Sequence, residues 1–534
     1  MVGRCSHCCN LMSNRVDISD LEVGARIRYG DNDLATIKYI GEVDGHTGLY
    51  IGVEWDNPER GKHNGTVDGV KYFETSYPTS GSMIRPGKIA EFENMRTAIE
   101  CRYMFDAILD NELLKATQRQ IKASLFEFVS DNRTQDKESH RKELTTVSLP
   151  NSNINSAGDL STFANLLVLD LTASLIPTWN VLADIVKQLP KLEHLDLTRN
   201  RLRLPTEEEI FELEKYFRHL KNINLRRCNL RQWSNVMHIA RLWPDIEQIS
   251  IAENSISFLQ PPDTTKIFRN LKFLDIKGNP LNYFSEVLKL GNIKTLQTLY
   301  CIATHIETIQ LPECDWNEYL DIFPSLEELN LNDNHLINQA MIFNELDKLK
   351  ALSNLSITIS DNIGYEETFT CAIGHIANLT VLNKKQINGT ERRGAEYDIW
   401  KRYSVDWVKS KENNELRTNL LRRCRVYSKL IEKYGQPDDI VSTVPKVSKF
   451  VTLKLINGNT HQATIKRISR NITVLTLQQL VAKLLGDQKS NLKGTAVLKY
   501  VDNENNIVVD MDSLNKTLDY YSIQDGNSVI AEWK

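Results

Sequence analysis

The pattern of apolar positions along the chain is strongest between residues 142 and 390. There, leucine or isoleucine recurs in one frame, Leu-x-x-Leu-x-Leu-x-x-Asn-x-Leu, whose clearest copy covers residues 192–202. The frame begins again at Leu144, Leu166, Leu192, Leu220, Ile246, Leu271, Leu296, Leu326, Leu352 and Leu379. Alternating apolar residues within each copy predict one short strand per repeat, with one side facing the core.

A repeat of this length and composition is typical of leucine-rich repeats. The ninth frame position must satisfy backbone groups where each strand turns outward, and small or polar residues occupy it. These residues are Ser152, Ser174, Asn200, Cys228, Asn254, Asn279, Thr304, Asn334 and Ser360. Because each repeat buries its apolar side only against its neighbours, residues 142–390 are predicted to form a curved α/β solenoid.

Strand alternation also predicts the inner face of the solenoid, which we define as the side chains two, four and six positions after each frame start. We expect this face to include His194, Asp196, Thr198, Asn222, Asn224, Arg226, Phe273, Asp275, Lys277, Thr298, Tyr300, Glu328, Asn330 and Asn332. Phe273 and Tyr300 are adjacent aromatic residues of the kind that anchor interfaces. The alternative is that they pack against a flanking element.

Residues 17–95 have a different pattern, in which short runs of β-forming residues alternate with glycine turns. Eleven of the 24 glycines of the chain fall between Gly24 and Gly87. The runs lie at 25–29, 35–40, 49–55 and 70–73. Such spacing predicts a small all-β barrel with many positive-φ turns or close backbone contacts.

The segments on either side of the solenoid are predicted to be helical. Residues 96–129 lack glycine and carry apolar residues at helical spacing, so we expect a helical linker and an N-terminal solenoid cap over 96–141. Residues 391–447 hold 13 Lys and Arg against 9 Asp and Glu, and are predicted as a helical cap and linker. Residues 1–16 are predicted to be a disordered tail.

The last segment, residues 448–534, predicts a β-grasp domain of the ubiquitin-like type. A strand starting at Phe450, a turn over 457–459 and a strand over 461–468 precede a helix over 475–485. Further strands are expected over 496–501, 507–509 and 529–533. The chain is therefore predicted to be multidomain: an all-β barrel, an α/β solenoid and a β-grasp domain.

Composition and charge say little about the fold, but they exclude several classes of partner and cellular location. The formal net charge is −4, which favours neither a nucleic acid nor a membrane partner. No run approaches the ~18 apolar residues of a membrane-spanning helix, and the N-terminus lacks the apolar core of a signal peptide. The nine cysteines mostly stand singly, as in a reducing compartment. We therefore expect the chain to stay in the cytosol or the nucleus.

Neither a metal site nor a catalytic motif is evident in the sequence. Cys5, His7, Cys8 and Cys9 form a cluster, but no second ligand pair follows at zinc-site spacing. The sequence lacks a Gly-x-x-x-x-Gly-Lys-Ser/Thr phosphate loop, a His-Glu-x-x-His motif and a Gly-x-Ser-x-Gly motif. We therefore expect no enzymatic activity, no cofactor and no metal.

Three segments of the barrel, residues 48–56, 61–73 and 81–88, resemble the CAP-Gly family. In that family a Gly-Lys-Asn-Asp-Gly loop and an aromatic groove bind acidic C-terminal peptides, of which the α-tubulin tail is the best known. The resemblance implies that the tail-binding residues here are Gly61, Lys62, His63, Asn64, Gly65, Tyr50, Trp55, Phe73 and Arg85. His63 and Asn64 replace the Asn and Asp of the family, Met83 stands where an aromatic residue is common, and Tyr50 stands where Trp is common.

The charge of the barrel sets the range over which an acidic peptide can be attracted. Residues 17–95 contain 8 Lys and Arg against 14 Asp and Glu, a net charge of −6. A barrel of this charge cannot steer an acidic tail over a long range, so any binding must rest on local contacts.

The order of a CAP-Gly domain, leucine-rich repeats and a ubiquitin-like domain resembles the tubulin-folding cofactor E family over nearly the whole chain. The resemblance implies a cytoplasmic, cytoskeleton-associated chaperone that binds α-tubulin. It also implies α/β-tubulin heterodimer assembly and disassembly in a larger complex with β-tubulin and other tubulin-folding cofactors. The alternative is a microtubule-associated adaptor that links tubulin to proteasome or ubiquitin-ligase components. The sequence ends without Gly-Gly, so we expect no ubiquitin-like conjugation.

Overall fold

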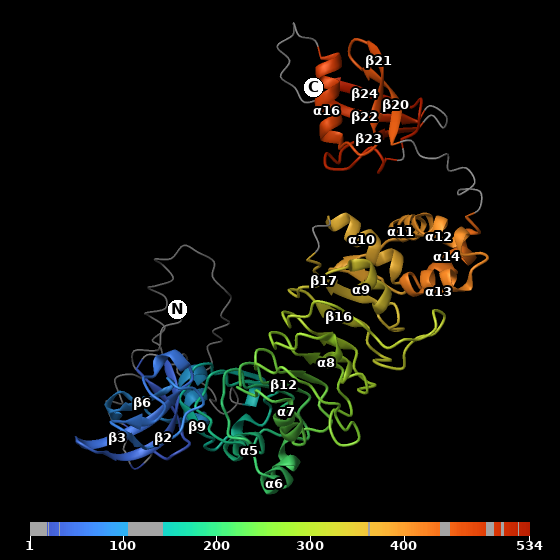
Figure 1. Cartoon of the computed structure of the whole chain (residues 1–534). Coiled ribbons are helices and arrows are strands. Elements are labelled where there is room, and N and C mark those ends of the chain that lie inside the picture. The colour runs from blue at the N-terminus through green and yellow to red at the C-terminus, as the bar shows by residue number, and fades with distance from the viewer. Residues whose placement is uncertain are drawn as a thin grey trace. The chain divides into compact units, whose positions relative to one another are not determined.

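The computed structural model describes residues 16, 19, 21–30, 32–104, 142–360, 364–437, 449–486, 496–502, 507–521 and 523–533 (Figure 1). They belong to two compact units. The first runs to Tyr403 and resumes over Asn413–Tyr434, and the second comprises Ser404–Glu412 and the part of the chain from Gly435. The predicted tail, with its Cys and His cluster, and most of the predicted linker over 96–141 lie outside the described residues.

The N-terminal part of the first unit is a barrel built on a four-stranded antiparallel sheet in the order β1-β2-β3-β6. Its elements are β1 (Arg26–Tyr29), β2 (Asp33–Val43), β3 (His46–Trp55), η2 (Pro58–Arg60), β4 (Thr66–Val67), β5 (Val70–Lys71), β6 (Gly81–Ile84) and η3 (Pro86–Lys88). Apolar residues at alternate strand positions, including Ile51, Val53 and Trp55 of β3, fill its core.

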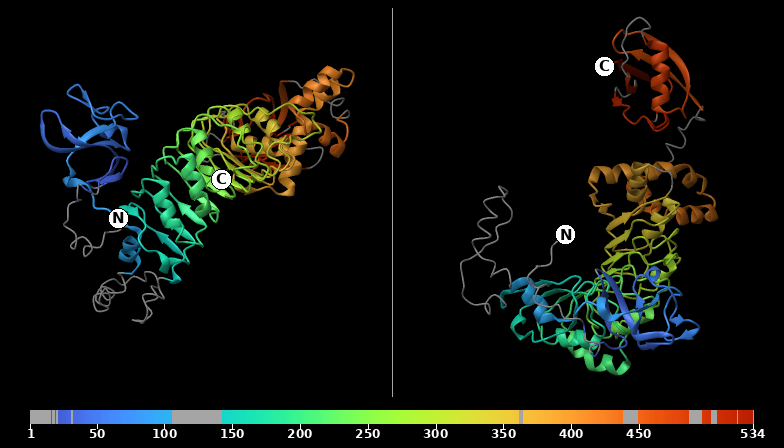
Figure 2. Two further views of the ribbon diagram at one scale, coloured as in Figure 1. Left: turned by 90° about the horizontal axis from the view of Figure 1, so that it is seen from below. Right: turned by 90° about the vertical axis from the view of Figure 1, so that its left-hand side faces the viewer.

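The solenoid contains one eleven-stranded sheet, in which ten strands run parallel and the last pairs antiparallel. Each of the ten predicted frames supplies one strand that starts two residues after the frame start. The strands are β8 (Thr146–Ser148), β10 (Val168–Asp170), β11 (His194–Asp196), β12 (Asn222–Asn224), β13 (Gln248–Ser250), β14 (Phe273–Asp275), β15 (Thr298–Tyr300), β16 (Glu328–Leu331), β17 (Asn354–Ile357), β18 (Val381–Leu382) and β19 (Lys385–Gln386). Figure 2 shows these strands stacked along the solenoid.

Helices return the chain between most of the strands and bury their apolar sides against the sheet. They are η6 (Ser161–Phe163), α5 (Trp179–Val186), α6 (Glu207–Phe217), α7 (Trp233–Ala240), α8 (Phe284–Leu288), α9 (Gln339–Leu346) and α10 (Tyr365–His375). At the start of the solenoid, β9 (Ile154–Ser156) pairs with β7 (Glu93–Asn94), which is followed by α2 (Met95–Ile99) and η4 (Glu100–Met104).

A ladder of buried polar side chains joins the repeats where the strands turn outward. The amide of Asn279 donates to the carbonyls of Ile251 and Ile276 at 3.1 and 2.9 Å. Its Oδ1 accepts from the backbone N–H groups of Asn254 and Ile256 at 3.1 and 3.0 Å. One side chain thus satisfies backbone groups of two repeats that would otherwise be buried without partners.

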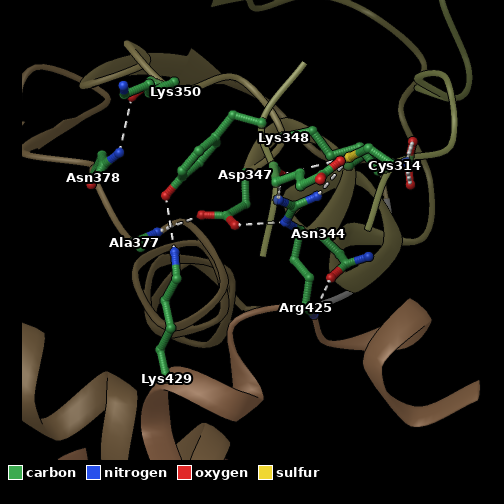
Figure 3. Close-up of polar contacts among 12 residues, drawn as sticks. Cys314, Asn344, Asp347, Lys348, Lys350, Ala377, Asn378, Arg425 and Lys429 are labelled. Carbon is green, nitrogen blue, oxygen red and sulfur yellow. Dashed lines mark hydrogen bonds and ion pairs between the residues drawn. The ribbon is translucent and has the colours of Figure 1, made fainter. Parts of the chain in front are cut away.

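The C-terminal end of the solenoid is covered by α11 (Gly389–Arg402), α13 (Asn414–Arg423) and α14 (Tyr427–Tyr434). Arg425, only 3% exposed, fixes this cap: its Nε donates to Asp347 at 2.9 Å, and its backbone N–H donates to Asn344 at 2.8 Å (Figure 3). Asp347 also accepts from the backbone N–H of Ala377 at 2.8 Å. A buried guanidinium is tolerated because it is paired and hydrogen-bonded.

The second unit contains α12 (Ser404–Lys409) and the C-terminal domain, a five-stranded sheet in the order β21-β20-β24-β22-β23. The domain comprises β20 (Phe450–Asn457), β21 (Ala463–Ser469), α16 (Val474–Leu485), β22 (Ala496–Asp502), β23 (Ile507–Asp510) and β24 (Ser528–Trp533). The first and last strands pair in parallel at the centre, and α16 packs its apolar side on the sheet. This is a β-grasp arrangement, and the predicted fold class is confirmed.

Replacing Asn279 by Ala tests the ladder. The change leaves several buried backbone groups of two repeats without partners, so the free energy of unfolding should fall by about 3 kcal/mol. Urea denaturation followed by circular dichroism measures it. The matched control is Asn270→Ala, since Asn270 is exposed and outside the ladder. Equal stability of the two variants would show that the ladder does not hold the repeats together.

Acid sensitivity is predicted from His375, which is fully buried on α10. Its Nδ1–H donates to the carbonyl of Cys371 at 2.8 Å, while Nε2 has no partner among the described residues. Burial therefore lowers the pKa of His375 from 6.5 to about 4. The unfolded chain binds the proton more tightly in this range, so stability should fall by about 3 kcal/mol as the pH drops from 6.5 to 4.

The measurement is the free energy of unfolding of His375→Leu against pH. This variant should lose part of the acid sensitivity of the natural chain, because it has no imidazole to protonate on unfolding. His335→Leu, at an exposed histidine, is the control and should keep the natural pH profile. If His375→Leu also keeps it, His375 does not cause the acid sensitivity.

Candidate functional site

The residues implied by the CAP-Gly resemblance centre on the segment Gly61–Gly65, which we call the tail loop. The loop leaves η2 and runs beside the start of β6. The backbone N–H of Lys62 donates to the carbonyl of Gly81 at 2.7 Å, and the N–H of Gly81 donates back to the carbonyl of His63 at 2.8 Å. These bonds fix the backbone of the loop, so its side chains project from a defined base.

Glycine is required at three points because the tail loop packs directly against backbone and ring atoms. A Cβ on Gly61 would lie 2.2 Å from the carbonyl oxygen of Thr79. A Cβ on Gly65, which has a φ of +96°, would lie 2.0 Å from the carbonyl oxygen of Phe73. On Gly81 it would lie 2.5 Å from the carbonyl oxygen of His63. Larger residues would push the loop away from β6.

The ring of Phe73 packs against the tail loop on its buried side. Its ring is 7% exposed and lies against Gly52, Gly65 and Gly81. The imidazole of His63 meets this ring edge to face at a centroid distance of 5.9 Å. The sequence pairs Phe73 with the tail-binding residues, and the structure places it under the loop, where it shapes the loop rather than exposing a large surface of its own.

His63 is held in one tautomer. Its Nδ1 accepts from the backbone N–H of Gly65 at 3.0 Å, which leaves Nε2–H as the donor of the ring. Burial lowers the pKa of His63, so the neutral ring is favoured. The His that replaces the family's Asn therefore still offers one hydrogen-bond donor beside the loop.

Lys62 and Asn64 are the exposed side chains of the tail loop. Asn64 accepts from the backbone N–H of Thr66 at 3.2 Å. Within the described ranges the ammonium of Lys62 makes no hydrogen bond or ion pair. A cation with no protein partner on a rigid glycine loop is suited to a carboxylate ligand.

Strand alternation places the remaining predicted residues on two different faces of β3. Tyr50 and Gly52 lie on one face, and Trp55 lies on the other with Ile51 and Val53. Trp55 is 1% exposed, and its Nε1–H donates to the hydroxyl of Ser82 at 2.9 Å. The structure therefore does not bring Trp55 together with Tyr50. Its ring belongs to the barrel core beneath the site.

The side chain of Arg85 makes its contacts within the barrel. Its guanidinium stacks 3.7 Å from the ring centroid of Tyr50 and donates to the carbonyls of Leu49 and Thr47 at 3.0 and 2.6 Å. Tyr50 is thereby held between Arg85 and His46. The charge of Arg85 remains exposed, but its geometry is set by the β2–β3 hairpin.

Two further aromatic residues share the surface of Tyr50 and Phe73 and were not predicted. The rings of Tyr39 and Tyr72 lie 5.2 Å apart, and Tyr39 packs against Gly52 beside Phe73. The hydroxyl of Tyr72 accepts from the backbone N–H of Asp44 at 2.9 Å. Tyr72 could have been found from its position next to Phe73. The position of Tyr39 could not be predicted, because the register between β2 and β3 shifts between Ile37 and Tyr39.

The predicted inner-face residues of the solenoid lie on, or just after, consecutive parallel strands. They alternate with buried leucine or isoleucine and are themselves partly or fully exposed: His194, Asp196, Asn222, Asn224, Arg226, Phe273, Asp275, Lys277, Tyr300, Glu328 and Asn330. A shallow hollow of about 350 Å³ on this face is lined by β10 to β14. The structure thus brings these side chains together on one surface.

Four of the polar inner-face side chains also serve the fold. Asp196 Oδ1 accepts from the backbone N–H of Thr198 at 2.8 Å, and Asp275 Oδ1 accepts from that of Lys277 at 3.0 Å. Asn224 and Asn330 make the same contact two residues ahead. These four residues, each four positions after a frame start, therefore cap their strands with one oxygen and keep the other polar atom for further contacts.

The aromatic pair on this face is formed as predicted from adjacency. Phe273 and Tyr300 meet edge to face at a centroid distance of 5.1 Å. The hydroxyl of Tyr300 donates to Glu328 at 3.2 Å, and burial together with this carboxylate raises the pKa of Tyr300. The two rings support each other within the sheet surface, and neither is buried.

Two negative findings apply to the described part of the chain. In those residues no three His, Cys, Asp or Glu side chains gather in a way that could hold a metal ion. No helix found there has the length and apolarity needed to cross a membrane.

Comparisons with known proteins cover the barrel and then the whole chain. The sequence profile of the CAP-Gly domain family matches residues 23–89. The chain is 42% identical over 519 residues to tubulin-specific chaperone E of Drosophila melanogaster, covering 96% of this chain and 98% of that protein. It is 30% identical over 537 residues to tubulin-specific chaperone E of Mus musculus, covering 97% of this chain and 100% of that protein.

Similar solved structures exist for parts of the chain. The C-terminal ubiquitin-like domain of mouse tubulin-specific chaperone E matches at 20% identity, covering 17% of this chain and 94% of that domain with a TM-score of 0.14. Internalin C2 of Listeria monocytogenes matches at 20% identity, covering 42% of this chain and 84% of that protein with a TM-score of 0.28. On the nearly full-length relatives from fly and mouse, the chain belongs to the tubulin-specific chaperone E family.

Proposed function

We propose that this chain is a tubulin chaperone that holds one subunit, α-tubulin, at two places. The tail loop binds the acidic C-terminal tail, and the inner face of the solenoid binds the body. The names of the relatives support a chaperone acting on tubulin rather than an enzyme. The observation that carries the proposal is the exposed Lys62 on a loop fixed by Gly61, Gly65 and Gly81.

The chemistry of the tail loop fits an acidic peptide that ends near an aromatic residue. Lys62 supplies a cation for a carboxylate, and His63 supplies a neutral donor beside it. The rings of Tyr39 and Tyr72 give an aromatic surface near these polar groups, since Tyr72 is hydrogen-bonded through its backbone N–H to the carbonyl of Gly65. Because the barrel is acidic overall, the specificity must come from these local contacts.

The inner face offers a broad polar surface with one aromatic pair, Phe273 and Tyr300, at its centre. Such a surface suits a folded protein partner better than a small molecule, since aromatic anchors surrounded by polar residues are typical of interfaces. Binding at one site raises the local concentration of tubulin at the other. Two sites of modest affinity in one chain can therefore give tight overall binding.

We extend this proposal to the assembly and disassembly of the α/β-tubulin heterodimer. In that process the chain acts with β-tubulin and other tubulin-folding cofactors in a larger complex. Family membership supports this extension. The ubiquitin-like domain has its own core and exposes Phe450 and Ile465, which makes it a further candidate for contact with these partners.

Replacing Lys62 by Ala tests the tail site in the full chain. The variant should bind an acidic α-tubulin tail peptide roughly 10-fold more weakly, because one charge-assisted contact is lost. Isothermal titration calorimetry measures the affinity. Lys88→Ala removes another exposed lysine of the barrel outside the tail loop and should leave the affinity unchanged. Equal losses in the two variants would mean that only net charge matters.

Replacing both Phe273 and Tyr300 by Ala tests the body site. Binding of tubulin without its C-terminal tails should weaken roughly 10-fold if this pair is an interface anchor. Size-exclusion chromatography, with α- and β-tubulin assayed separately, measures complex formation. Phe211→Ala, at an aromatic residue 83% exposed on α6, is the control. Unchanged binding would refute the anchor. Co-elution with intact heterodimer or polymer alone would favour the adaptor hypothesis.

A further inference from the structure

The segments that border the tail loop are attached to the solenoid. On one side, Asp56 precedes η2, which leads into the loop. The side chain of Asp56 accepts from Arg26 at 2.8 and 2.6 Å, and Arg26 is 1% exposed. Arg201 of the solenoid completes this cluster: its NH2 group donates to the backbone carbonyl of Asp56 at 2.8 Å, and its NH1 group lies 3.4 Å from Oδ1.

On the other side, the segment from Ser76 to Gly81 carries Tyr77. The guanidinium of Arg231 lies 4.5 Å from the ring centroid of Tyr77. Arg231 is oriented by a 2.9 Å hydrogen bond from its Nε to Asn229. The carbonyl of Tyr77 accepts from the backbone N–H of Ser80, next to the Gly81 that pairs with the tail loop. Both borders of the loop therefore contact the solenoid through an arginine.

The two arginines come from successive repeats, nine positions after Leu192 and eleven positions after Leu220. They follow the ladder residues Asn200 and Cys228 by one and three positions. Because the ladder fixes the backbone nearby, the spacing between Arg201 and Arg231 is set by the repeat geometry rather than by the barrel.

Two further contacts between the barrel and the solenoid involve the buried residues Arg28 and Leu34. Arg28 of β1, 2% exposed, donates from Nε to Asn153 at 3.0 Å and from NH2 to the carbonyl of Ala173 at 2.9 Å. Leu34 of β2 packs in an apolar cluster with Ala173 and Leu175 of the solenoid. A guanidinium is buried at this depth only where its donors meet acceptors, so the contact has one preferred geometry.

We propose that Arg201 and Arg231 are positioning residues that hold the tail loop at a fixed place relative to the inner face. The tail and the body of one tubulin subunit then bind to a single rigid surface instead of two independently moving domains. The inference rests on the proposed function, and it adds that the strength of two-site binding depends on these arginines. Rigid linkage raises the effective concentration of the second site once the first is occupied.

The test uses the full chain with Arg201→Gln and Arg231→Gln combined. Three affinities are measured by biolayer interferometry: for the tail peptide, for tubulin without tails, and for intact tubulin. Affinity for intact tubulin should fall roughly 10-fold, since both sites must be engaged to benefit from rigid linkage. Affinities for the peptide and for tail-less tubulin should each change by less than about 2-fold, because neither site is altered.

The matched control combines Arg218→Gln and Arg241→Gln. These arginines pair with Glu214 and Glu207 on the helical side of the same part of the solenoid, and within the described residues they make no hydrogen bond or ion pair with the barrel. The control should bind all three ligands like the natural chain. If the Arg201 and Arg231 variant also binds intact tubulin like the natural chain, the positioning role is refuted. A parallel loss for all three ligands would refute it as well, because that pattern indicates damage to the sites themselves.

Hydrogen–deuterium exchange without tubulin separates this inference from the proposed function. Segments 56–65 and 75–81 should exchange slowly in the natural chain and in the control, and faster in the Arg201 and Arg231 variant. Equal exchange in all three chains would show that Arg201 and Arg231 do not hold the loop, and it would refute the proposal. If the natural chain binds neither the peptide nor tail-less tubulin, the proposed function is wrong, and the exchange experiment still decides whether the arginines hold the loop.

Discussion

Satisfying the backbone at the outward turn of every repeat is the constraint on which this structure depends. The strands of the solenoid are only two to four residues long, so each repeat buries much of its backbone outside regular pairing. Asn254, Asn279 and Asn334 meet this need by donating to carbonyls of their own repeat and of the one before it. Without these side chains, unpaired backbone N–H and C=O groups would be buried at the edge of the leucine core. The free-energy cost of burying them would exceed the stabilisation from the apolar contacts nearby.

The same constraint produces a regular left-handed position one residue before the ladder. Asn151, Ala173, Arg199, Arg227, Glu253, Gly278, Ala303 and Asp333 all have a positive φ. Only one of these eight is glycine, so the turn is imposed by the repeat and not chosen by the local sequence. This regular backbone lets residues just beyond the ladder, such as Arg201, project at defined places toward the barrel.

Periodicity explains how much could be predicted from the sequence. The ten strands lie where the leucine frame places them, because the frame encodes both the period and the buried side of each strand. The polar inner-face residues follow from the same alternation. Asp196 and Asp275 also cap their own strands. This second role could not be predicted from the alternation, because it depends on a backbone turn that the frame does not specify.

Contacts between distant segments could not be predicted in this way. Trp55 was grouped with the tail-binding residues through the family resemblance, whereas alternation along β3 places it in the core opposite Tyr50. Arg28 and Arg201 carry no local signal at all, since an isolated arginine in a strand or a loop is usually solvent-exposed. Their partners lie 125 and 145 residues away in sequence and are brought close only by the docking of barrel on solenoid.

Cys228 places a thiol, a group that reagents can detect, at one position of the polar ladder. Its thiol stands where four of the nine ladder positions have an Asn amide, and it donates to the carbonyl of Leu197 at 3.2 Å, while the neighbouring Asn200 Oδ1 has no partner in the described part of the chain. Burial raises the pKa of Cys228 to about 12, so the closed solenoid keeps this sulfur protonated and unreactive toward alkylating reagents. Cys228 lies between Arg201 and Arg231 in sequence, in the repeats that carry the barrel. Alkylation at this residue would therefore record each opening of the solenoid at the barrel's attachment, with the natural sequence serving as its own probe.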